Sequence, residues 1–375
     1  MNRVCRHFGE CGGCSFQDIP YSEQVLRKKE RLIEVSGFDE ADIIPSEKLI
    51  GFRNKMEFSF EGESLGLHPK GRFSRVVDLS ECPVFSGWVG DFLEKVREFA
   101  SEKSLSFYRR REKKGLLRYL ILRESKFTGQ KMAVLVVDGT DFSEEKEWGE
   151  AARSAVDGME SVILARRHTS GDSALTEDYE VVSGSEYIEM KIGHTTLDIS
   201  PYSFFQPNSF QVENLYSLVS SRLEDNCSIL DLYSGIGSIP FYLAAPGRDI
   251  TGVESYPVCN RDARRNLKKI KPPGTVRFIQ EGVKKFVSSM DREYDYIIVD
   301  PPRGGMSYRI WKHINRFSET SERLKKIFYI CCSLKNLKTD MSYIRENTDW
   351  KLIRVTGVDQ FVHTPHLETV VEYAV

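Results

Sequence analysis

The sequence has 375 residues, which is enough for two domains that each bury a core. Hydrophobic residues make up 40% of the chain and charged residues 29%, an ordinary balance for a globular protein. The formal net charge is −2, from 53 Lys and Arg against 55 Asp and Glu, so the overall charge does not indicate a polyanionic partner. A local basic surface remains compatible with this sum, because a net charge does not report how charges are distributed.

Cysteine usage and the first residues indicate the compartment. The chain contains eight cysteines: Cys5, Cys11, Cys14, Cys82, Cys227, Cys259, Cys331 and Cys332. In a protein of this size they do not form a disulfide framework. The first residues, MNRVCRHFGECGG, lack the apolar segment of a signal peptide, and no run of 18 apolar residues occurs. We therefore expect a cytoplasmic monomer without membrane association, whose thiols are reduced or bound to metal.

The first half of the chain mixes helical and strand-like patterns. Residues 21–36 carry apolar side chains at helical spacing and are followed by Gly37. The patterns further along predict strands at 56–60, 117–125 and 131–138 and helices at 87–103 and 144–157. We expect an α+β domain over residues 1–195, whose helix near 21–36 can pack on the second domain.

Strands and helices alternate in the second half of the chain. Short apolar strands are predicted at 228–237, 248–255, 275–282, 294–305, 325–333 and 350–361, with helices at 257–269 and 308–323 between them. This alternation predicts a doubly wound α/β domain over residues 196–375.

The stretch DLYSGIG, residues 231–237, places a glycine turn directly after a buried strand, where a backbone can approach a ligand closely. Glu254 ends the next strand, and an acidic side chain there suits the hydroxyl groups of a ribose. The third glycine of a nicotinamide fingerprint is replaced by Pro240. Gly-x-Gly alone also fits a simple turn, whereas together with Glu254 it favours a nucleoside cofactor, and S-adenosylmethionine over NAD.

The stretch VDPPRGGM, residues 299–306, follows a predicted strand. Asp300 therefore lies at the carboxyl edge of the sheet, where such folds bind ligands. The two prolines stiffen the loop and remove two N–H donors. A rigid turn is the alternative interpretation, but an acid followed by Pro-Pro at this place is typical of nucleic-acid methyltransferases that act on a base.

The stretch IFYICCSLKN, residues 327–336, delivers two cysteines to the same edge of the sheet. A thiolate at that place can act as a nucleophile. A small buried hydrophobe is the commoner role of a cysteine in a strand.

Near the end of the chain, HTPHLETV (363–370) contains Glu368 and two histidines, which can transfer protons. The two histidines could also suggest metal ligands, and a surface loop is the third interpretation.

The stretch CGGCSF, residues 11–16, follows Cys5 closely and allows three interpretations. A redox Cys-x-x-Cys motif would follow a strand and open a helix, whereas here two glycines separate the thiols in a loop. A zinc site and a metal cluster remain, and both need a fourth thiolate. Cys82 can supply it, because the proline after it is typical of ferredoxin-like Cys-Pro pairs.

Taken together, these motifs resemble those of the RNA uracil-C5 methyltransferases, which make 5-methyluridine in transfer and ribosomal RNA. The resemblance covers nearly the whole chain. It rests on FRNKMEFSF (52–60), SFFQPN (203–208), DLYSGIG, DPPRGG, the Tyr-x-x-Cys of YICC, HTPHLE and the spacing of the N-terminal cysteines. It implies a Rossmann-like S-adenosylmethionine-dependent methyltransferase domain behind an N-terminal α+β domain that carries an iron–sulfur cluster.

The resemblance also implies a mechanism and a set of residues. A thiolate adds to C6 of uracil, C5 takes the methyl group, and a base removes the C5 proton before the cysteine leaves. Matching positions imply Cys332 as the nucleophile and Glu368 as the base. The implied cofactor-binding residues are Gln206, Tyr233, Glu254 and Asp300, of which Asp300 and Gln206 also face the uracil. A cytosine-C5 methyltransferase and a non-catalytic iron–sulfur RNA-binding protein are the alternatives, and Glu368 beside an intact Cys332 counts against both.

The chain departs from the family pattern in two places. The family's Ser-Cys-Asn-Pro is replaced by Cys331-Cys332-Ser333-Leu334, which leaves open which thiol acts. We also expect no N-terminal β-barrel RNA-binding module, because Cys5 lies too near the start of the chain. This short form favours ribosomal RNA over transfer RNA as the partner.

The same resemblance favours a [4Fe-4S] cluster on Cys5, Cys11, Cys14 and Cys82 over zinc. No step of the reaction needs an electron, so we expect the cluster to be a structural clip or part of an RNA-binding surface. Further RNA contacts are expected from the basic stretches YRRREKKG (108–115) and LRKKERL (26–32), for which a solvated surface is the alternative. Phe204 and Phe205 could stack on a flipped base.

Overall fold

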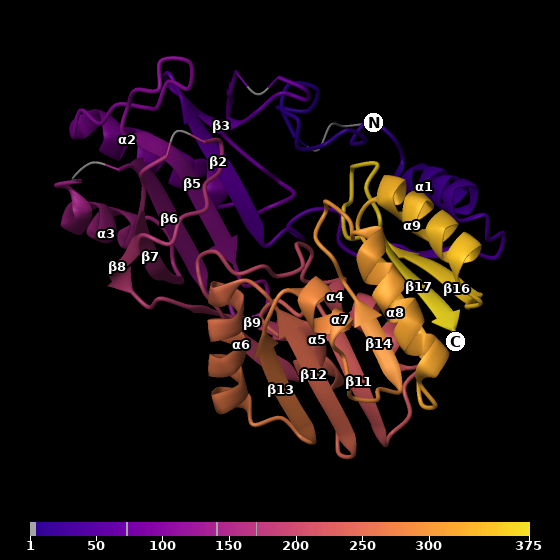
Figure 1. The fold of residues 1–375 in the computed structure, drawn as a ribbon. Helices are drawn as coiled ribbons and strands as arrows, with labels where there is room; N and C mark the ends of the chain where they lie inside the picture. Colours follow the sequence, from indigo (N-terminus) through magenta and orange to yellow (C-terminus); the bar gives the residue numbers. More distant parts are fainter. Residues whose placement is uncertain (1–4, 73, 140–141, 170) are drawn as a thin grey trace.

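The fold contains two large sheets. The first half of the chain forms most of one sheet, and the second half forms most of the other (Figure 1). The computed structural model describes residues 5–72, 74–139, 142–169 and 171–375. The first four residues, which form part of the N-terminal stretch used above to judge targeting, lie outside this description. No helix within the described residues is both long and apolar enough to cross a membrane.

The first sheet has seven strands. In spatial order they are β4 (Val77–Asp78), β3 (Ser64–Leu67), β2 (Lys55–Glu61), β5 (Leu117–Glu124), β6 (Lys131–Asp138), β7 (Met159–Arg167) and β8 (Tyr179–Gly184). All neighbours are antiparallel except β6 and β7, which run parallel and are connected through α3 (Glu145–Ser154). One face packs against α2 (Val89–Glu102) and α3. The central strands β5 and β6 are apolar on both faces, which predicts that the second face is covered too.

The second sheet has eight strands. In spatial order they are β1 (Asp42–Ile44), β16 (Lys351–Val358), β17 (Glu368–Ala374), β15 (Lys326–Cys331), β14 (Tyr296–Val299), β11 (Cys227–Leu232), β12 (Arg248–Glu254) and β13 (Thr275–Gln280). The strands from β15 to β13 pair in parallel, and β17 lies antiparallel between β15 and β16. This confirms the α/β methyltransferase-like arrangement expected for the second half.

Helices connect the strands of the second sheet. They are α4 (Val212–Ser220), α5 (Ser238–Leu243), α6 (Pro257–Ile270), α7 (Val283–Ser288), α8 (Tyr308–Thr320) and α9 (Leu334–Asn347). The longer ones are amphipathic; α8, for example, buries Ile310, Trp311, Ile314 and Phe317 and leaves its polar residues outside. Such crossovers are what parallel strands require.

The N-terminal segment contributes to the second sheet. The helix α1 (Tyr21–Ser36) lies beside α9 (Figure 1), and Gly37 ends it in the left-handed conformation. The short strand β1 then pairs in parallel with β16. Sequence patterns predict α1, but a strand of three residues carries no recognisable pattern of its own.

A shared core joins the two sheets. The small hairpin of β9 (Ile188–Ile192) and β10 (Thr195–Ile199) pairs only with itself among the described strands and packs on α6. One apolar cluster contains Ile121 and Val134 from the first sheet, Leu197 from the hairpin, and Ile229 and Ile298 from the second sheet. The second face of the seven-stranded sheet is therefore buried against the other half of the chain.

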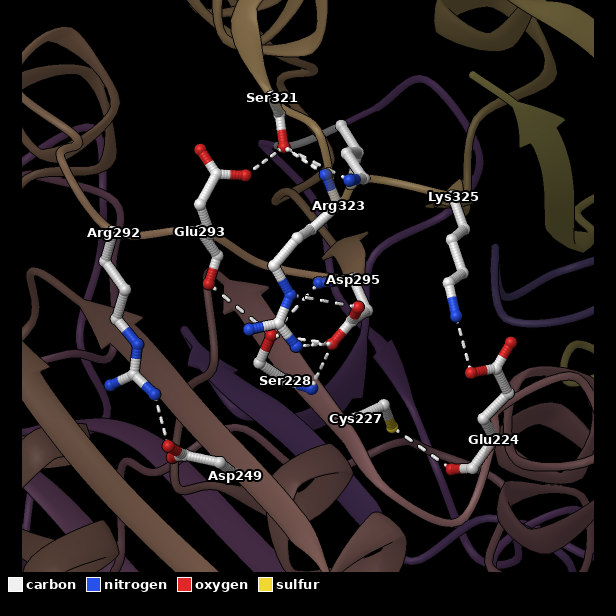
Figure 2. A network of polar contacts seen from close by, with 11 residues as sticks. Glu224, Cys227, Ser228, Asp249, Arg292, Glu293, Asp295, Ser321, Arg323 and Lys325 are labelled. Atoms are coloured by element: carbon white, nitrogen blue, oxygen red, sulfur yellow. Dashed lines mark hydrogen bonds and ion pairs between the residues drawn. The ribbon is translucent and has the colours of Figure 1, made fainter.

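A polar network fixes the amino-terminal edge of the second sheet (Figure 2). Asp295 accepts hydrogen bonds from the Ser228 N–H at 2.7 Å and the Ser228 hydroxyl at 2.9 Å, and it pairs with Arg323 at 2.7 Å. Burial alone would raise the pKa of Asp295, but these partners outweigh it and lower the pKa. The network joins β11 to the segments before β14 and β15 at the edge opposite the candidate site.

Candidate active site

Three acidic residues predicted from the motifs follow parallel strands of the second sheet. Asp231 lies near the end of β11, Glu254 ends β12, and Asp300 directly follows β14. Parallel strands end at one edge of a sheet, so the sheet brings these carboxyl groups together. The charges of the other two, Asp300 and Glu254, both raise the pKa of Asp231, as expected for neighbouring acids.

The turn after β11 is shaped to approach a ligand. Tyr233 has a φ of 67° and Gly237 a φ of 84°, both in the left-handed region. A Cβ atom at Gly237 would lie 2.5 Å from the ring of Phe278, so only glycine fits. Glu254 accepts hydrogen bonds from the Gly235 N–H at 3.0 Å and the Tyr256 N–H at 2.7 Å, which holds its carboxylate beside the turn.

Asp231 is the buried acid with unused hydrogen-bonding capacity. It is fully buried, and neither carboxylate oxygen has a hydrogen-bond partner among the described residues. The hydroxyl of the nearby Ser234 is likewise without one. Burial first, and then the charges of Asp300 and Glu254, raise the pKa of Asp231 far above its usual value. Buried polar groups of this kind are expensive unless a ligand completes them.

Gln206 lies against Asp300. The Gln206 side-chain amide is 3.4 Å from an Asp300 carboxylate oxygen, and burial raises the pKa of Asp300 to about 7 despite this hydrogen bond. The Gln206 backbone carbonyl accepts a hydrogen bond from the Asn54 side chain at 2.7 Å. Residues from three distant parts of the sequence thus meet here, as the motif assignments require.

Cys332 and Glu368 also converge on this edge. In the pairing of β15 with β17, Cys331 lies opposite Thr369, so Cys332 emerges from the sheet beside Glu368. Burial, followed by the charge of Glu368, raises the pKa of the Cys332 thiol to about 11. Burial and the Asp300 charge raise the pKa of Glu368, against the opposing charge of Arg303. Arg303, in the DPPRGG loop, is the cation that faces both groups.

Cys331 and Cys332 lie in different environments. Cys331 is 4% exposed and packs in the apolar core with Trp311 and Leu337, and its thiol donates to the Ser333 carbonyl at 3.3 Å. Cys332 follows the end of the strand and is partly exposed. Successive strand residues point to opposite faces, which explains the difference.

The two histidines of HTPHLE have separate surroundings. His363 is buried and hydrogen-bonded to Gln24 and to the Leu49 carbonyl, whereas His366 packs edge-on against Phe361. Among the described residues no group of three or more His, Cys, Asp or Glu is arranged to hold a metal ion. Both ring nitrogens of His363 are therefore engaged, and its role as a proton-transfer group stays a prediction.

The four N-terminal candidate ligands gather in one place. Cys5, Cys11, Cys14 and Cys82 line a cavity of about 30 Å³. Burial is the main cause of the raised pKa values of Cys5, Cys14 and Cys82, and the charges of neighbouring thiols add to it. Arg53 lines the same cavity.

The residues predicted to contact RNA differ in their solvent exposure. Phe204 is 60% exposed, whereas Phe205 is buried in the core. In the stretch 26–32, Lys28 is buried in an ion pair with Asp359, so the prediction was wrong for this residue. The tip of the stretch 108–115 is exposed.

Several residues of this region were not identified from the sequence. Arg303 lies in the DPPRGG motif. Its positive charge at the carboxyl edge of the predicted sheet could have identified it as a site residue. Asn54 and Gln24 act through backbone partners more than a hundred residues away, and no sequence pattern indicates such contacts.

Comparison with known proteins identifies the family of the chain. A family model described as tRNA (Uracil-5-)-methyltransferase matches residues 278–374. The tRNA (uracil(54)-C(5))-methyltransferase of Pyrococcus horikoshii is 34% identical, over 99% of this chain and 85% of that protein. An uncharacterized RNA methyltransferase of Thermotoga maritima is 30% identical, over 98% of this chain and 83% of that protein.

A solved structure is similar along the same length. It is the Pyrococcus abyssi tRNA (uracil-54, C5)-methyltransferase in complex with S-adenosyl-L-homocysteine, with a TM-score of 0.81 and 29% identity. The match covers 97% of this chain and 86% of that chain. Sequence and fold therefore agree, and the protein belongs to the family of S-adenosylmethionine-dependent RNA uracil-C5 methyltransferases.

Proposed function

We propose that this enzyme methylates C5 of the uridine at position 54 of transfer RNA through a covalent bond between Cys332 and C6 of uracil. The observation that carries the proposal is the meeting of a partly exposed thiol and a buried carboxyl group, Cys332 and Glu368, beside Asp300 at one sheet edge. Relatives with a stated substrate act on uridine 54 of transfer RNA. The preference for ribosomal RNA expected from the short form finds no support among them.

Asp231, Tyr233 and Glu254 are proposed to hold the cofactor. The unpartnered Asp231 oxygens and the turn at Gly235 offer hydrogen-bonding groups to a bound nucleoside, and Glu254 suits its ribose. S-adenosylmethionine supplies an electrophilic methyl group when bound. Asp300 and Gln206 lie between this region and Cys332, which suits contacts with both the cofactor and the uracil edge.

The residues perform complementary tasks on the uracil ring. The Cys332 thiolate adds to C6, which makes C5 nucleophilic toward the methyl group. The Glu368 carboxylate then takes the C5 proton, the C6–S bond breaks, and its electron pair returns to Cys332 as thiolate. A raised pKa suits Glu368 for accepting a proton, and the Arg303 guanidinium favours the thiolate.

A methyl-transfer assay tests the substrate. The protein is incubated with labelled S-adenosylmethionine and transfer-RNA transcripts that carry uridine or cytidine at position 54. We expect label only in the uridine transcript, recovered as 5-methyluridine at position 54. Label in a ribosomal-RNA fragment and none in transfer RNA would contradict the assignment of the substrate, and label in the cytidine transcript would favour the cytosine-C5 alternative.

We also propose that Cys5, Cys11, Cys14 and Cys82 bind a [4Fe-4S] cluster, although in the described residues their thiols are not arranged around a metal ion. Four thiols lining one cavity are the donor set that such a cluster takes. Zinc accepts the same donors, so metal analysis must distinguish the two. Protein prepared anaerobically should contain about four iron atoms per chain and absorb broadly near about 400 nm, and Cys82→Ser should lose both. Zinc in place of iron, or no metal, would overturn this assignment.

A further inference from the structure

The turn that leads into Glu368 is held from outside the second half of the chain. It joins β16 to β17 over residues 359–367. His363, at its centre, is 4% exposed and has a φ of 63°, in a region that side chains with a Cβ rarely adopt. Such a backbone persists only where the surroundings fix it.

Gln24 of α1 is the residue that binds this strained point directly. Its side chain is fully buried, and its carboxamide oxygen accepts the His363 backbone N–H at 3.1 Å. Its amide nitrogen lies 3.2 Å from His363 Nδ1, and it also contacts the carbonyls of Phe16 at 2.8 Å and Ile19 at 2.9 Å. One side chain thus ties the turn to α1 and to the segment before α1.

The hydrogen-bond chemistry at His363 is consistent along this chain of contacts. His363 Nε2 lies 3.1 Å from the Leu49 carbonyl, which can only accept, so Nε2 carries the proton. In the neutral ring Nδ1 is an acceptor, and it shares the two hydrogens of the Gln24 amide with the Phe16 and Ile19 carbonyls. Burial lowers the pKa of His363, which favours this neutral form.

Other contacts fasten the turn at both sides of His363. Lys28 pairs with Asp359 at 2.7 Å and donates to the Phe361 carbonyl at 3.1 Å, both in a buried setting. The His363 carbonyl accepts the backbone N–H groups of Ser15 at 2.8 Å and Phe16 at 3.0 Å. These two residues directly follow the candidate metal ligand Cys14, so the turn also touches the cysteine loop.

We propose that Gln24 is a positioning residue for Glu368: by holding the His363 turn it sets where β17 begins and therefore where the Glu368 carboxylate lies relative to Cys332. The inference rests on the proposed function, in which Glu368 takes the C5 proton. Cys332 follows β15, to which Gln24 makes no hydrogen bond among the described residues, so its attack on C6 depends less on this contact.

Two steps of the reaction therefore respond differently to a change at Gln24. Formation of the C6–S bond requires only Cys332 and a bound uracil. Removal of the C5 proton by Glu368, with cleavage of the C6–S bond, requires the carboxylate in its place. Small misplacements of a catalytic group reduce a rate on the order of 100-fold.

The experiment compares these steps in Gln24→Leu. With RNA that carries 5-fluorouridine at the target and S-adenosylmethionine, the fluorine cannot leave as a proton. The covalent complex therefore accumulates and reports attack and methyl transfer without removal of the C5 proton. We expect trapping within about 2-fold of the parent protein, a turnover on ordinary RNA reduced on the order of 10- to 100-fold, and accumulation of the methylated protein–RNA complex. Ser22→Ala, an exposed change on the same helix outside the stretch 26–32, should match the parent in all three.

A second variant, at His363, tests the same positioning role. His363→Gly retains the left-handed backbone but removes the ring that Gln24 contacts, and it should give the same split between trapping and turnover. Equal losses of trapping and turnover in both variants, or unchanged turnover in Gln24→Leu, would overturn the positioning role. Failure of the parent protein itself to be trapped would instead contradict the proposed function.

Discussion

At the residue scale, the site consists of groups that are costly to bury. Asp231, Asp300, Glu254 and Glu368 share one edge of the sheet, and each of Asp231, Asp300 and Glu368 has a raised pKa, chiefly through burial. Such an arrangement opposes folding, and it persists in proteins where a ligand or a reaction uses the groups.

Asp231→Asn should therefore stabilise the protein while weakening cofactor binding. A neutral amide avoids the cost of a buried carboxylate, so the free energy of unfolding should rise by about 1 kcal/mol at pH 7 to 8, or about 2 °C in Tm. The pKa of Asp231 is higher in the folded than in the unfolded protein, where it is near 3.8. Below that pH the side chain is protonated in both states and costs no stability. As the pH rises above it, Asp231 increasingly destabilises the folded protein. The gain should thus vanish near pH 4, and a lower Tm at neutral pH would contradict the account.

Trapping of the enzyme by 5-fluorouridine RNA should speed up as the pH rises. The pKa of Cys332 is about 11, so the thiolate fraction grows about tenfold for each pH unit below that value. Measured single-turnover rates between pH 7 and pH 9 should follow this slope. Glu368→Gln removes a charge that raises the pKa of Cys332, so it should trap faster at each pH while failing to release methylated RNA. A rate independent of pH would show that Cys332 is already ionised in the complex.

At the scale of elements, the edge of the second sheet that carries the candidate site differs from the opposite edge in its hydrogen bonding. Near the carboxyl ends of the strands, polar groups of Asp231 and Ser234 have no hydrogen-bond partner in the described part of the chain. At the amino ends, Asp295, Ser228 and Arg323 satisfy one another (Figure 2). Satisfied buried networks stabilise a fold, and unsatisfied ones indicate where a ligand binds.

Asp295→Ala should destabilise the protein by about 2 to 4 kcal/mol, because it leaves the buried Ser228 N–H and Arg323 without their acceptor. Denaturant unfolding measures the change, and the exposed Asp291→Ala serves as the matched control. Methyl transfer by the folded fraction should be retained, since the network lies at the far edge. A cost equal to that of the control would show that the network contributes nothing.

The elements differ in how far the sequence could predict them. Apolar runs such as 131–138 and the amphipathic helix 21–36 have strong patterns, and both form nearly as predicted. The strand β17 was missed because HTPHLETV suggested a loop, although Glu368 is in fact its first residue. The strand β1 depends on the presence of β16, and the contact of Gln24 with His363 depends on the folded turn, so neither has a local signal.

At the scale of the whole molecule, the N-terminal segment belongs physically to both halves. Within the described residues, the loop after Cys14 contacts His363, α1 lies on α9, and β1 extends the second sheet (Figure 1). Leu32, Val35 and Ile43 join the same apolar cluster as residues of β15 and α9. The boundary at residue 195 stays a prediction, and these contacts define how it can be tested.

A fragment of residues 196–375 should not unfold cooperatively at the temperature of the complete chain. Without α1 and β1 it exposes the apolar surface that Leu32 and Ile43 cover and leaves the edge of β16 unpaired. Circular dichroism and dye binding compare the fragment with the complete chain. A fragment with the same Tm and no dye binding would show that the second half is an independent domain.

The most direct test of the central claim locates the covalent bond. The protein is incubated with S-adenosylmethionine and transfer RNA that carries 5-fluorouridine at position 54, and the trapped complex is digested and its peptides are sequenced by mass spectrometry. The account predicts a methylated fluorouracil bonded to Cys332, loss of the complex in Cys332→Ala, and its retention in Cys331→Ala. A bond to Cys331, or no covalent complex with any uridine-containing RNA, would contradict it.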